Sequence, residues 1–127
     1  MKKGGDSGLY QLILRLPKKS RIRVGKLRTF DFPSGYYVYT GSAKRGLSAR
    51  IRRHLSGLKK KFWHIDYLLA KSEIVEIRVF RRHNLTECEL ARRTASREGA
   101  ELVVSAFGAS DCRCQSHLVF FRSRHEW

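Results

Sequence analysis

The hydrophobic positions of the first forty residues alternate as they do in β-strands. Residues 8–16 read GLYQLILRL, and four large side chains fall on one face, namely Tyr10, Leu12, Leu14 and Leu16. A turn over residues 17–20 precedes residues 21–30, which we expect to return antiparallel with an interruption at Gly25 that suits a bulge. Residues 32–35 then turn the chain into a tyrosine-rich strand that contains Tyr37 and Tyr39. The pattern predicts three strands at the start of the chain.

The period of the hydrophobic positions then changes to that of a helix. Small residues at 41–43 (Gly-Ser-Ala) are expected to turn tightly or to lie close to a ligand. After them, apolar side chains recur at helical spacing, at Leu47, Ile51, Leu55 and Leu58, and Ser-Gly at 56–57 ends the predicted helix. Residues 62–70 are predicted as a short helix and 73–81 as a strand. Residues 102–104 suit a helix or a strand, 107–116 a loop, and 117–121 a closing strand.

A capping box separates the roles of two neighbouring glutamates. In the run 86–89, Thr86 is expected to cap a helix while Glu89 reaches back to the Thr86 amide. The helix should extend to about Arg97, because Gly99 can end it. If Glu89 is occupied by capping, Glu87 is the carboxylate left free for chemistry.

This order of elements predicts the fold class and the number of domains. Strands mixed with three helices in 127 residues are typical of one α/β (α+β) domain, with a small mixed or antiparallel sheet flanked by helices. We expect the domain to span residues 1–127, with residues 1–7 as a flexible tail.

The charge distribution indicates the class of partner. The chain has 27 Lys and Arg against 11 Asp and Glu, a net charge of +16. Residues 1–65 hold 17 of these cations and 2 of the acids, so the excess belongs to the first half. Between Asp31 and Asp66 there is no carboxylate, yet the interval carries Lys44, Arg45, Arg50, Arg52, Arg53, Lys59, Lys60 and Lys61. Such a field suits nucleic acid, although charge runs are often only a solvated helix face.

Other partners and compartments are less well supported by the sequence. No stretch is long enough to span a bilayer, and neither a signal peptide nor an amphipathic membrane anchor is visible. Three cysteines are an odd number, which fits a reducing cytoplasm better than a disulfide scaffold. Zinc is an alternative for the tail, because two thiols and an imidazole lie close in sequence and a third thiol could join them; the set is Cys88, Cys112, Cys114 and His117.

Several motifs together resemble a known family. Gly8-Leu9-Tyr10 in a first strand, Tyr39-Thr40-Gly41 in a later one, Arg50 and His54 on a helix and a glutamate on another helix look like a GIY-YIG nuclease domain. Within that superfamily the chain most resembles a small single-domain branch of unknown function, whose members share YVYTGSA, RIRRH, HIDYLL, ECELA and SDCRCQSHL. The resemblance covers nearly the whole chain.

The resemblance implies metal-dependent cleavage of phosphodiester bonds, more often in DNA and with a link to repair. It assigns the two signature tyrosines to Tyr10 and Tyr39, a charge-stabilising role to Arg50, a proton-transfer role to His54 and a Mg²⁺ or Mn²⁺ ion to Glu87. The departures are Thr40 in place of the usual isoleucine and an inserted strand at residues 21–30. The late asparagine of many such domains has no clear match, and Ser110 or Asp111 lies near its place.

The same residues also suit structural roles without catalysis. A strand tyrosine is often a packing residue, His54 suits a helix surface, and His64 with Asp66 suits a hydrogen-bonded pair that holds the short helix. The whole domain could also be a non-catalytic binding module that stacks bases on Tyr37 and Tyr39, or a zinc-stabilised structural domain. An enzyme requires Tyr10, Tyr39, Arg50 and Glu87 to converge on one positively charged surface.

Overall fold

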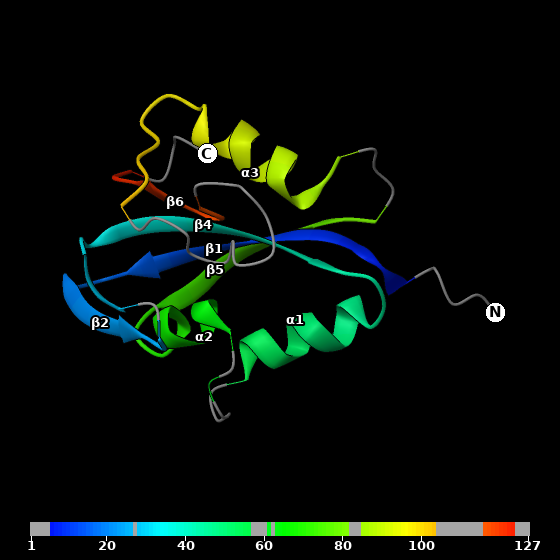
Figure 1. Ribbon diagram of the computed structural model, residues 1–127, viewed down its shortest axis with the longest axis horizontal. Helices are drawn as coiled ribbons and strands as arrows, with labels where there is room; N and C mark the ends of the chain where they lie inside the picture. Colours follow the sequence, from blue (N-terminus) through cyan, green and yellow to red (C-terminus); the bar gives the residue numbers. More distant parts are fainter. Residues whose placement is uncertain are drawn as a thin grey trace.

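A four-stranded antiparallel sheet forms the centre of the molecule. The computed structural model describes residues 6–26, 28–56, 61, 63–81, 85–103 and 116–123. The strand order is β5-β1-β4-β6, with β1 at Gly8–Leu16, β4 at Gly35–Ala43, β5 at Glu73–Phe80 and β6 at Leu118–Phe121 (Figure 1). Each neighbouring pair runs antiparallel. The central strand β1 is buried on both faces over residues 9–14, in keeping with its run of Leu and Ile.

A separate hairpin corrects the prediction of one strand over residues 21–30. The chain forms β2 at Ser20–Val24 and β3 at Arg28–Phe32, which pair antiparallel in a two-stranded sheet of their own. Gly25 has φ of +50°, a left-handed turn conformation that glycine adopts without a Cβ clash. The glycine therefore reverses the chain instead of forming a bulge, and β4, not this segment, pairs with β1.

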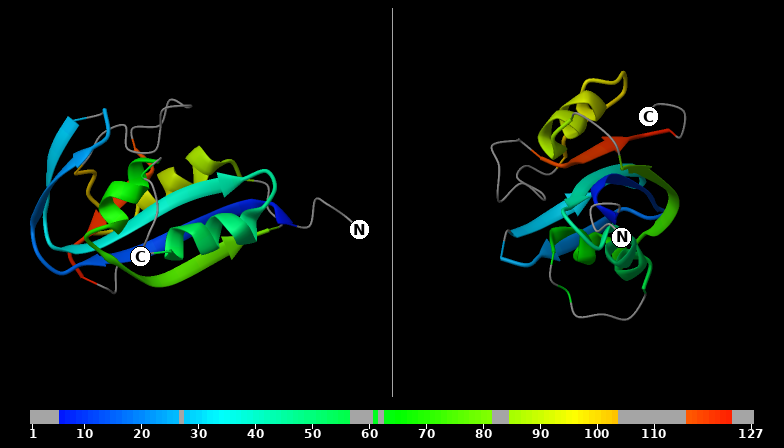
Figure 2. Two further views of the ribbon diagram at one scale, coloured as in Figure 1. Left: turned by 90° about the horizontal axis from the view of Figure 1, so that it is seen from below. Right: turned by 90° about the vertical axis from the view of Figure 1, so that its right-hand side faces the viewer.

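The helices lie on the two faces of the sheet. Helices α1 (Leu47–Leu55) and α2 (His64–Leu69) lie on the same face as the β2–β3 hairpin, and α3 (Glu87–Ala95) covers the other face (Figures 1 and 2). The main core joins the expected face of β1 to Leu47, Ile65 and Leu68 of the first two helices. A smaller cluster on the opposite face includes Ile13 and Val38. The predicted class, an antiparallel sheet flanked by helices, is confirmed.

Some boundaries and faces differ from the sequence prediction. Residues 41–43 continue β4 instead of turning, and α3 ends at Ala95. Leu55 is 57% exposed, while His54 is buried on the sheet side of α1. Leu102 and Val103 lie in neither a helix nor a strand, although Glu101 makes a bridge to Phe120. Residues 104–115, with most of the predicted loop, lie outside the described residues.

The N-terminal segment is tied to α1 at Asp6, within the stretch expected to be a flexible tail. Its carboxylate accepts hydrogen bonds from the Ser48 amide at 3.1 Å and the Ser48 hydroxyl at 2.9 Å, and it pairs with Arg81 at 3.0 Å. Asp6 thereby caps a helix whose own first turn has no acidic residue. Within the described ranges, no helix has the length and apolar character needed to cross a membrane.

Candidate functional site

The two tyrosines that the resemblance singled out lie side by side on neighbouring strands. Tyr10 is paired in register with Gly41, and Tyr39 with Leu12, so both tyrosines face α1 with ring centroids 6.3 Å apart. A Cβ at position 41 would lie 2.6 Å from the Tyr10 hydroxyl and ring. Gly41 is therefore needed for the packing of Tyr10, and this explains the glycine that the sequence suggested for a turn.

Burial excludes one role proposed for the tyrosines. Tyr37 is fully buried and Tyr39 is 8% exposed, so neither ring is available to stack on a nucleic-acid base. Stacking on Tyr37 and Tyr39, expected for a binding module, is contradicted by this packing.

Tyr10 is hydrogen-bonded to the helix histidine. Its hydroxyl lies 2.7 Å from Nε2 of His54, and both side chains are buried. Burial raises the pKa of Tyr10 to about 12; the charge of Arg50 opposes this rise, and the carboxylates of Glu87 and Asp66 add to it. Tyr10 is thus a neutral phenol at neutral pH, held against a potential proton acceptor.

Two arginines of α1 stack on one tryptophan but have different partners. The guanidinium groups of Arg50 and Arg53 lie 4.8 and 4.4 Å from the Trp63 ring centroid. Arg53 also donates to the buried carboxylate of Asp66 at 3.0 Å, and the Trp63 amide donates to the same group at 2.9 Å. Asp66 thus neutralises Arg53, and its expected pair with His64 stays a prediction. Arg50 donates to the carbonyl of Ser42 in β4.

Glu87 lies in the first turn of α3 with both carboxylate oxygens engaged. The Ser42 hydroxyl donates to Oε1 at 2.6 Å, and Nδ1 of His117 lies 2.7 Å from Oε2. Burial alone would raise the pKa of Glu87, but His117, Ser42 and the charge of Arg50 outweigh it and lower the pKa. The predicted capping box is confirmed, because Thr86 and Glu89 exchange hydrogen bonds at 2.8 and 3.1 Å. Glu87 is therefore an ionised carboxylate that takes no part in capping.

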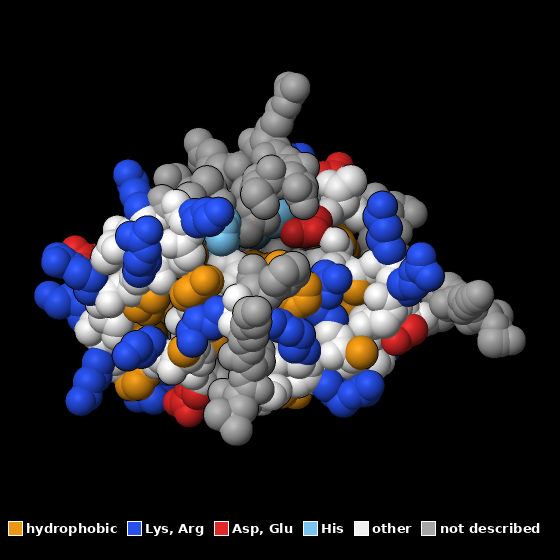
Figure 3. All heavy atoms as spheres, turned by 60° about the horizontal axis from the view of Figure 1, so that its bottom comes forward, with side chains coloured by type: hydrophobic (Ala, Val, Ile, Leu, Met, Phe, Trp, Pro, Cys, Tyr) orange, Lys and Arg blue, Asp and Glu red, His pale blue; other side chains and the backbone are white. Residues whose placement is uncertain are grey.

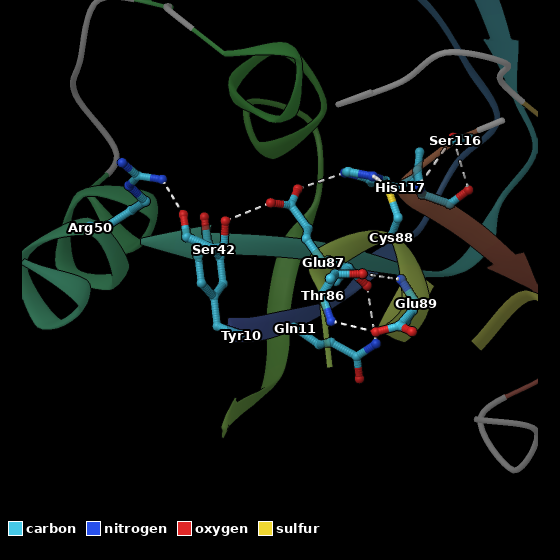
Figure 4. A network of polar contacts seen from close by, with 12 residues as sticks. Tyr10, Gln11, Ser42, Arg50, Thr86, Glu87, Cys88, Glu89, Ser116 and His117 are labelled. Carbon is cyan, nitrogen blue, oxygen red and sulfur yellow. Dashed lines mark hydrogen bonds and ion pairs between the residues drawn. The ribbon is translucent and has the colours of Figure 1, made fainter. Parts of the chain in front are cut away.

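Ser42 connects the two faces of the sheet. Helix α3 packs on the face opposite to Tyr10, yet the Glu87 carboxylate reaches the end of β4, where the Ser42 carbonyl binds Arg50 and the Ser42 hydroxyl binds Glu87 (Figure 4). The charges of Arg50 and Glu87 both act on the pKa of Tyr10 and of Tyr39. Arg50 and Glu87 thus meet at Ser42 near the end of β4, and their charges reach Tyr10 and Tyr39, which lie on the other face of the sheet from α3.

The chemistry of Glu87 fits a magnesium or manganese ion. Its side chain is 27% exposed and its lowered pKa keeps it ionised. Mg²⁺ is commonly held by one or two carboxylates together with waters and substrate phosphates. A partly exposed carboxylate, whose oxygens can each accept a further contact beside those of Ser42 and His117, is therefore compatible with such an ion.

The residues of the zinc alternative are only partly described. His117 binds Glu87 through Nδ1, and its Nε2 lies 3.5 Å from Sγ of Cys88. Cys88 is disulfide-bonded, which differs from the reduced state that the cysteine count suggested. Cys112 and Cys114 lie outside the described residues, as do Ser110 and Asp111. In the described part of the chain, no group of three or more His, Cys, Asp or Glu side chains is placed to hold a metal ion.

The cations assigned to nucleic acid differ in availability. Lys44, Arg45, Arg52 and Lys61 are exposed, whereas Arg53 is half-buried against Asp66 and Trp63. Lys59 and Lys60 lie outside the described residues. The exposed members remain suitable for phosphate contacts, and Arg53 instead stabilises the junction of α1 and α2.

Sequence reasoning misses the connecting residues of this site. It assigns Ser42 to a turn, His117 only to zinc, and Trp63 to no role in the site. The contacts of Ser42 and His117 with Glu87 join residues 45 and 30 positions apart in sequence (87 − 42 and 117 − 87). No local pattern predicts such contacts, because they depend on how α3 and β6 are placed against β4.

Comparison with known proteins gives a family but no function. Searches of curated proteins and of solved structures find no match. The family described as "Domain of unknown function DUF123" has a sequence model that matches residues 9–127, nearly the whole chain. The protein therefore belongs to this family of unknown function.

Proposed function

We propose that the protein is a metal-dependent nuclease of the GIY-YIG type that hydrolyses phosphodiester bonds in DNA. The observation that carries the proposal is the meeting of Arg50 and Glu87 at Ser42, with the charges of both reaching Tyr10, which is bonded to His54. A cation, an ionised carboxylate and a proton acceptor in one place are the groups that such a hydrolysis requires. A nucleic-acid substrate is consistent with the net charge of +16.

Arg50 and Glu87 would act on the charge of the phosphodiester. Arg50 is half-buried and keeps further N–H donors besides the one that binds Ser42, so it can stabilise the charge that develops on the phosphoryl oxygens. Glu87 would hold the divalent ion, with Ser42 and His117 fixing the carboxylate. When bound, the ion would neutralise charge and polarise the phosphoryl group.

Tyr10 and His54 would act as a pair in proton transfer. A pKa of about 12 leaves little phenolate at neutral pH, so Tyr10 alone is a poor base. The 2.7 Å bond to His54 offers another route. Tyr10 is 1% exposed, so the attacking water would have to reach its hydroxyl within the site; as the Tyr10 oxygen takes a proton from that water, its own proton would pass to Nε2 of His54. The water oxygen would then bond to phosphorus as the bond from phosphorus to the leaving oxygen breaks, and the leaving oxygen would keep the electron pair and take up a proton from solvent.

The test is cleavage of labelled duplex, branched and single-stranded DNA and of RNA, with Mg²⁺ or Mn²⁺ and with chelator. Glu87→Gln should reduce metal-dependent cleavage by at least about 100-fold, because a ligand of the ion is lost. Binding should stay equal or tighten, since a negative charge leaves a surface that attracts polyanions. Cleavage should also stop when chelator removes the ion.

Glu89→Gln is the matched control for this experiment. Glutamine still serves at the third position of a capping box, so cleavage and fold should be nearly unchanged. Cleavage that persists in Glu87→Gln, or that fails only in Glu89→Gln, would show that the metal was assigned to the wrong glutamate.

A second candidate is a nucleic-acid-binding module without catalysis. It is favoured by one observation: the Tyr10 side chain is only 1% exposed, which suits a packing role for its bond to His54. Binding would then depend on the exposed cations alone, because Tyr37 and Tyr39 are buried. Absence of cleavage by the wild-type protein on all of these substrates, with binding intact, would favour this candidate.

A further inference from the structure

The β2–β3 hairpin carries a second concentration of positive charge, apart from α1. Residues 17–34 hold six cations and one carboxylate; the cations are Lys18, Lys19, Arg21, Arg23, Lys26 and Arg28, and the acid is Asp31. The segment therefore has a net charge of +5, which is nearly a third of the excess of the whole chain. The nuclease proposal assigns this hairpin no role.

The hairpin is held firmly against the rest of the fold. Ile22, Val24 and Phe32 are buried in the main core, and the turn at Gly25 lies against the Tyr67 ring of α2. Because side chains alternate along a strand, Arg21 and Arg23 fall on the outer face. Arg21 and Arg23 are thus mounted on a strand that packs on the core, while Lys18, Lys19 and Lys26 lie in the turns next to it.

Most of these cations make no ion pair in the described part of the chain. Arg21 pairs with Asp31 at 2.8 Å, and the Arg28 guanidinium lies 5.0 Å from the Phe30 ring centroid. Among the described residues no ion pair with a carboxylate involves the other four, Lys18, Lys19, Arg23 and Lys26, and all four are exposed. Uncompensated cations repel one another, so a surface that keeps them is suited to a polyanion.

The position of the hairpin aligns it with the candidate site. The hairpin, α2 and α1 follow one another on the same side of the sheet, along the longest dimension of the molecule (Figure 1). On this side Lys and Arg side chains are spread from the hairpin end across to the α1 end (Figure 3). One extended anion could therefore contact both elements.

We propose that the outer face of the β2–β3 hairpin is a second phosphate-binding surface and that one DNA duplex spans it and α1. The assignment of DNA rests on the proposed nuclease function. A duplex suits two fixed surfaces because it is stiff over about 150 base pairs, so bridging them requires no ordering of the ligand. An anionic membrane is disfavoured, since the exposed large apolar side chains of the described residues, Leu55, Val79 and Leu102, all lie outside the hairpin.

The test compares two double variants that remove the same charge from opposite faces. Arg23→Ala with Lys26→Ala changes the hairpin, and Arg92→Ala with Arg93→Ala changes exposed positions of α3, with circular dichroism to check folding. Binding of labelled duplexes of about 10 and about 30 base pairs, roughly 34 and 100 Å at 3.4 Å per pair, is followed by anisotropy as a function of salt. Chelator is present, so that binding is measured without cleavage.

The affinity of the hairpin variant for the longer duplex should depend less on salt than that of the wild type. Each lost phosphate contact lowers the slope of log affinity against log salt by about 0.9, or about 1.8 for two. The fall in affinity between 50 and 200 mM salt should then be about 12-fold smaller than in the wild type. For the hairpin variant, the magnitude of this slope should also differ less between the short and the long duplex than it does for the wild type. The α3 variant should resemble the wild type.

Several outcomes would overturn the inference. These are equal slopes for the hairpin variant and the wild type, an effect confined to the α3 variant, or a loss of binding to phosphatidylserine vesicles in place of DNA. A wild type that binds with the expected slopes but cuts nothing would contradict the nuclease proposal and still support the hairpin surface. A wild type that cuts DNA while the slopes are equal would contradict the hairpin surface alone.

Discussion

Gly41 and Ser42 are neighbours in β4 that serve opposite faces of the sheet. Gly41 leaves room for the Tyr10 ring on the α1 side, while the Ser42 hydroxyl holds Glu87, which comes from the α3 side. The Ser42 carbonyl adds Arg50 to the same point. Because strand side chains alternate, two adjacent residues can organise both halves of a site.

Replacing Gly41 by alanine should destabilise the protein through the Tyr10 ring. A Cβ 2.6 Å from the ring and hydroxyl forces a buried side chain to move, and overpacking of this kind typically costs about 1–3 kcal/mol. The shift should also weaken the bond between Tyr10 and His54. Urea unfolding of Gly41→Ala and of the wild type measures the loss.

Gly46 provides a control for this substitution. It has φ of +70°, and a Cβ added there would meet nothing within 4 Å, so its requirement for glycine comes from the backbone alone. Asparagine tolerates that conformation, and Gly46→Asn should be nearly neutral. A Gly41→Ala variant as stable as Gly46→Asn would mean that Tyr10 is free to move.

At the scale of the element, the start of α3 decides where Glu87 lies. Thr86 caps the helix and Glu89 returns the hydrogen bond, which fixes the first turn that carries Glu87. The N-terminal end of a helix also favours a negative charge, so the same turn stabilises the ionised carboxylate. The cap is therefore a positioning device for the candidate metal ligand.

Thr86→Ala should cost about 1 kcal/mol of stability, because one amide of the first turn loses its acceptor. Cleavage should fall as well, since Glu87 is less firmly held against Ser42 and His117. Thr86→Ser keeps the hydroxyl and should retain both properties. Urea unfolding measures the stability of both variants, and the cleavage assay measures their activity. A Thr86→Ala protein with the stability and cleavage of the wild type would show that Ser42 and His117 alone position Glu87.

Elements with complete local signals can be predicted from the sequence. The predicted bounds of β1 agree with the structure, and α1 and the capping box of α3 are also found, because periodicity and caps are properties of neighbouring residues. The prediction for Gly25 is wrong, since an isolated glycine in an alternating stretch suits a bulge or a turn equally well. Only the packing of Ile22, Val24 and Phe32 on the core distinguishes the two.

The candidate site is predictable as a set of residues but not as an arrangement. Tyr10 and Tyr39 lie on neighbouring strands, because β1 pairs with β4. The burial of His54 depends on a tyrosine 44 positions away in sequence, and the apolar spacing of α1 suggests the wrong face through Leu55. Long-range contacts of this kind leave no trace in hydrophobic periodicity.

At the scale of the whole molecule, charge repulsion opposes folding. A net charge of +16 on 127 residues destabilises the compact state, because folding brings cations closer together. Exposed ion pairs such as Arg15 with Glu73 and Arg21 with Asp31 act in the opposite sense, but pairs of this kind are weak because water and salt screen them. Repulsion should therefore outweigh these pairs in the salt dependence of stability.

Thermal stability should accordingly rise with sodium chloride between about 50 and 500 mM, as the Debye length falls from roughly 14 to 4 Å and screens the repulsion. Relief of about 1 kcal/mol would raise Tm by roughly 4 °C for a chain of this size. The Arg92→Ala, Arg93→Ala variant carries two fewer cations, and its Tm should depend less on salt than that of the wild type. Scanning calorimetry or circular dichroism at several salt concentrations measures both slopes. If Tm fell as salt increased, the ion pairs would outweigh the repulsion between cations. The excess positive charge would then cost the fold no stability, and it could not be explained as a cost accepted in order to bind a polyanion.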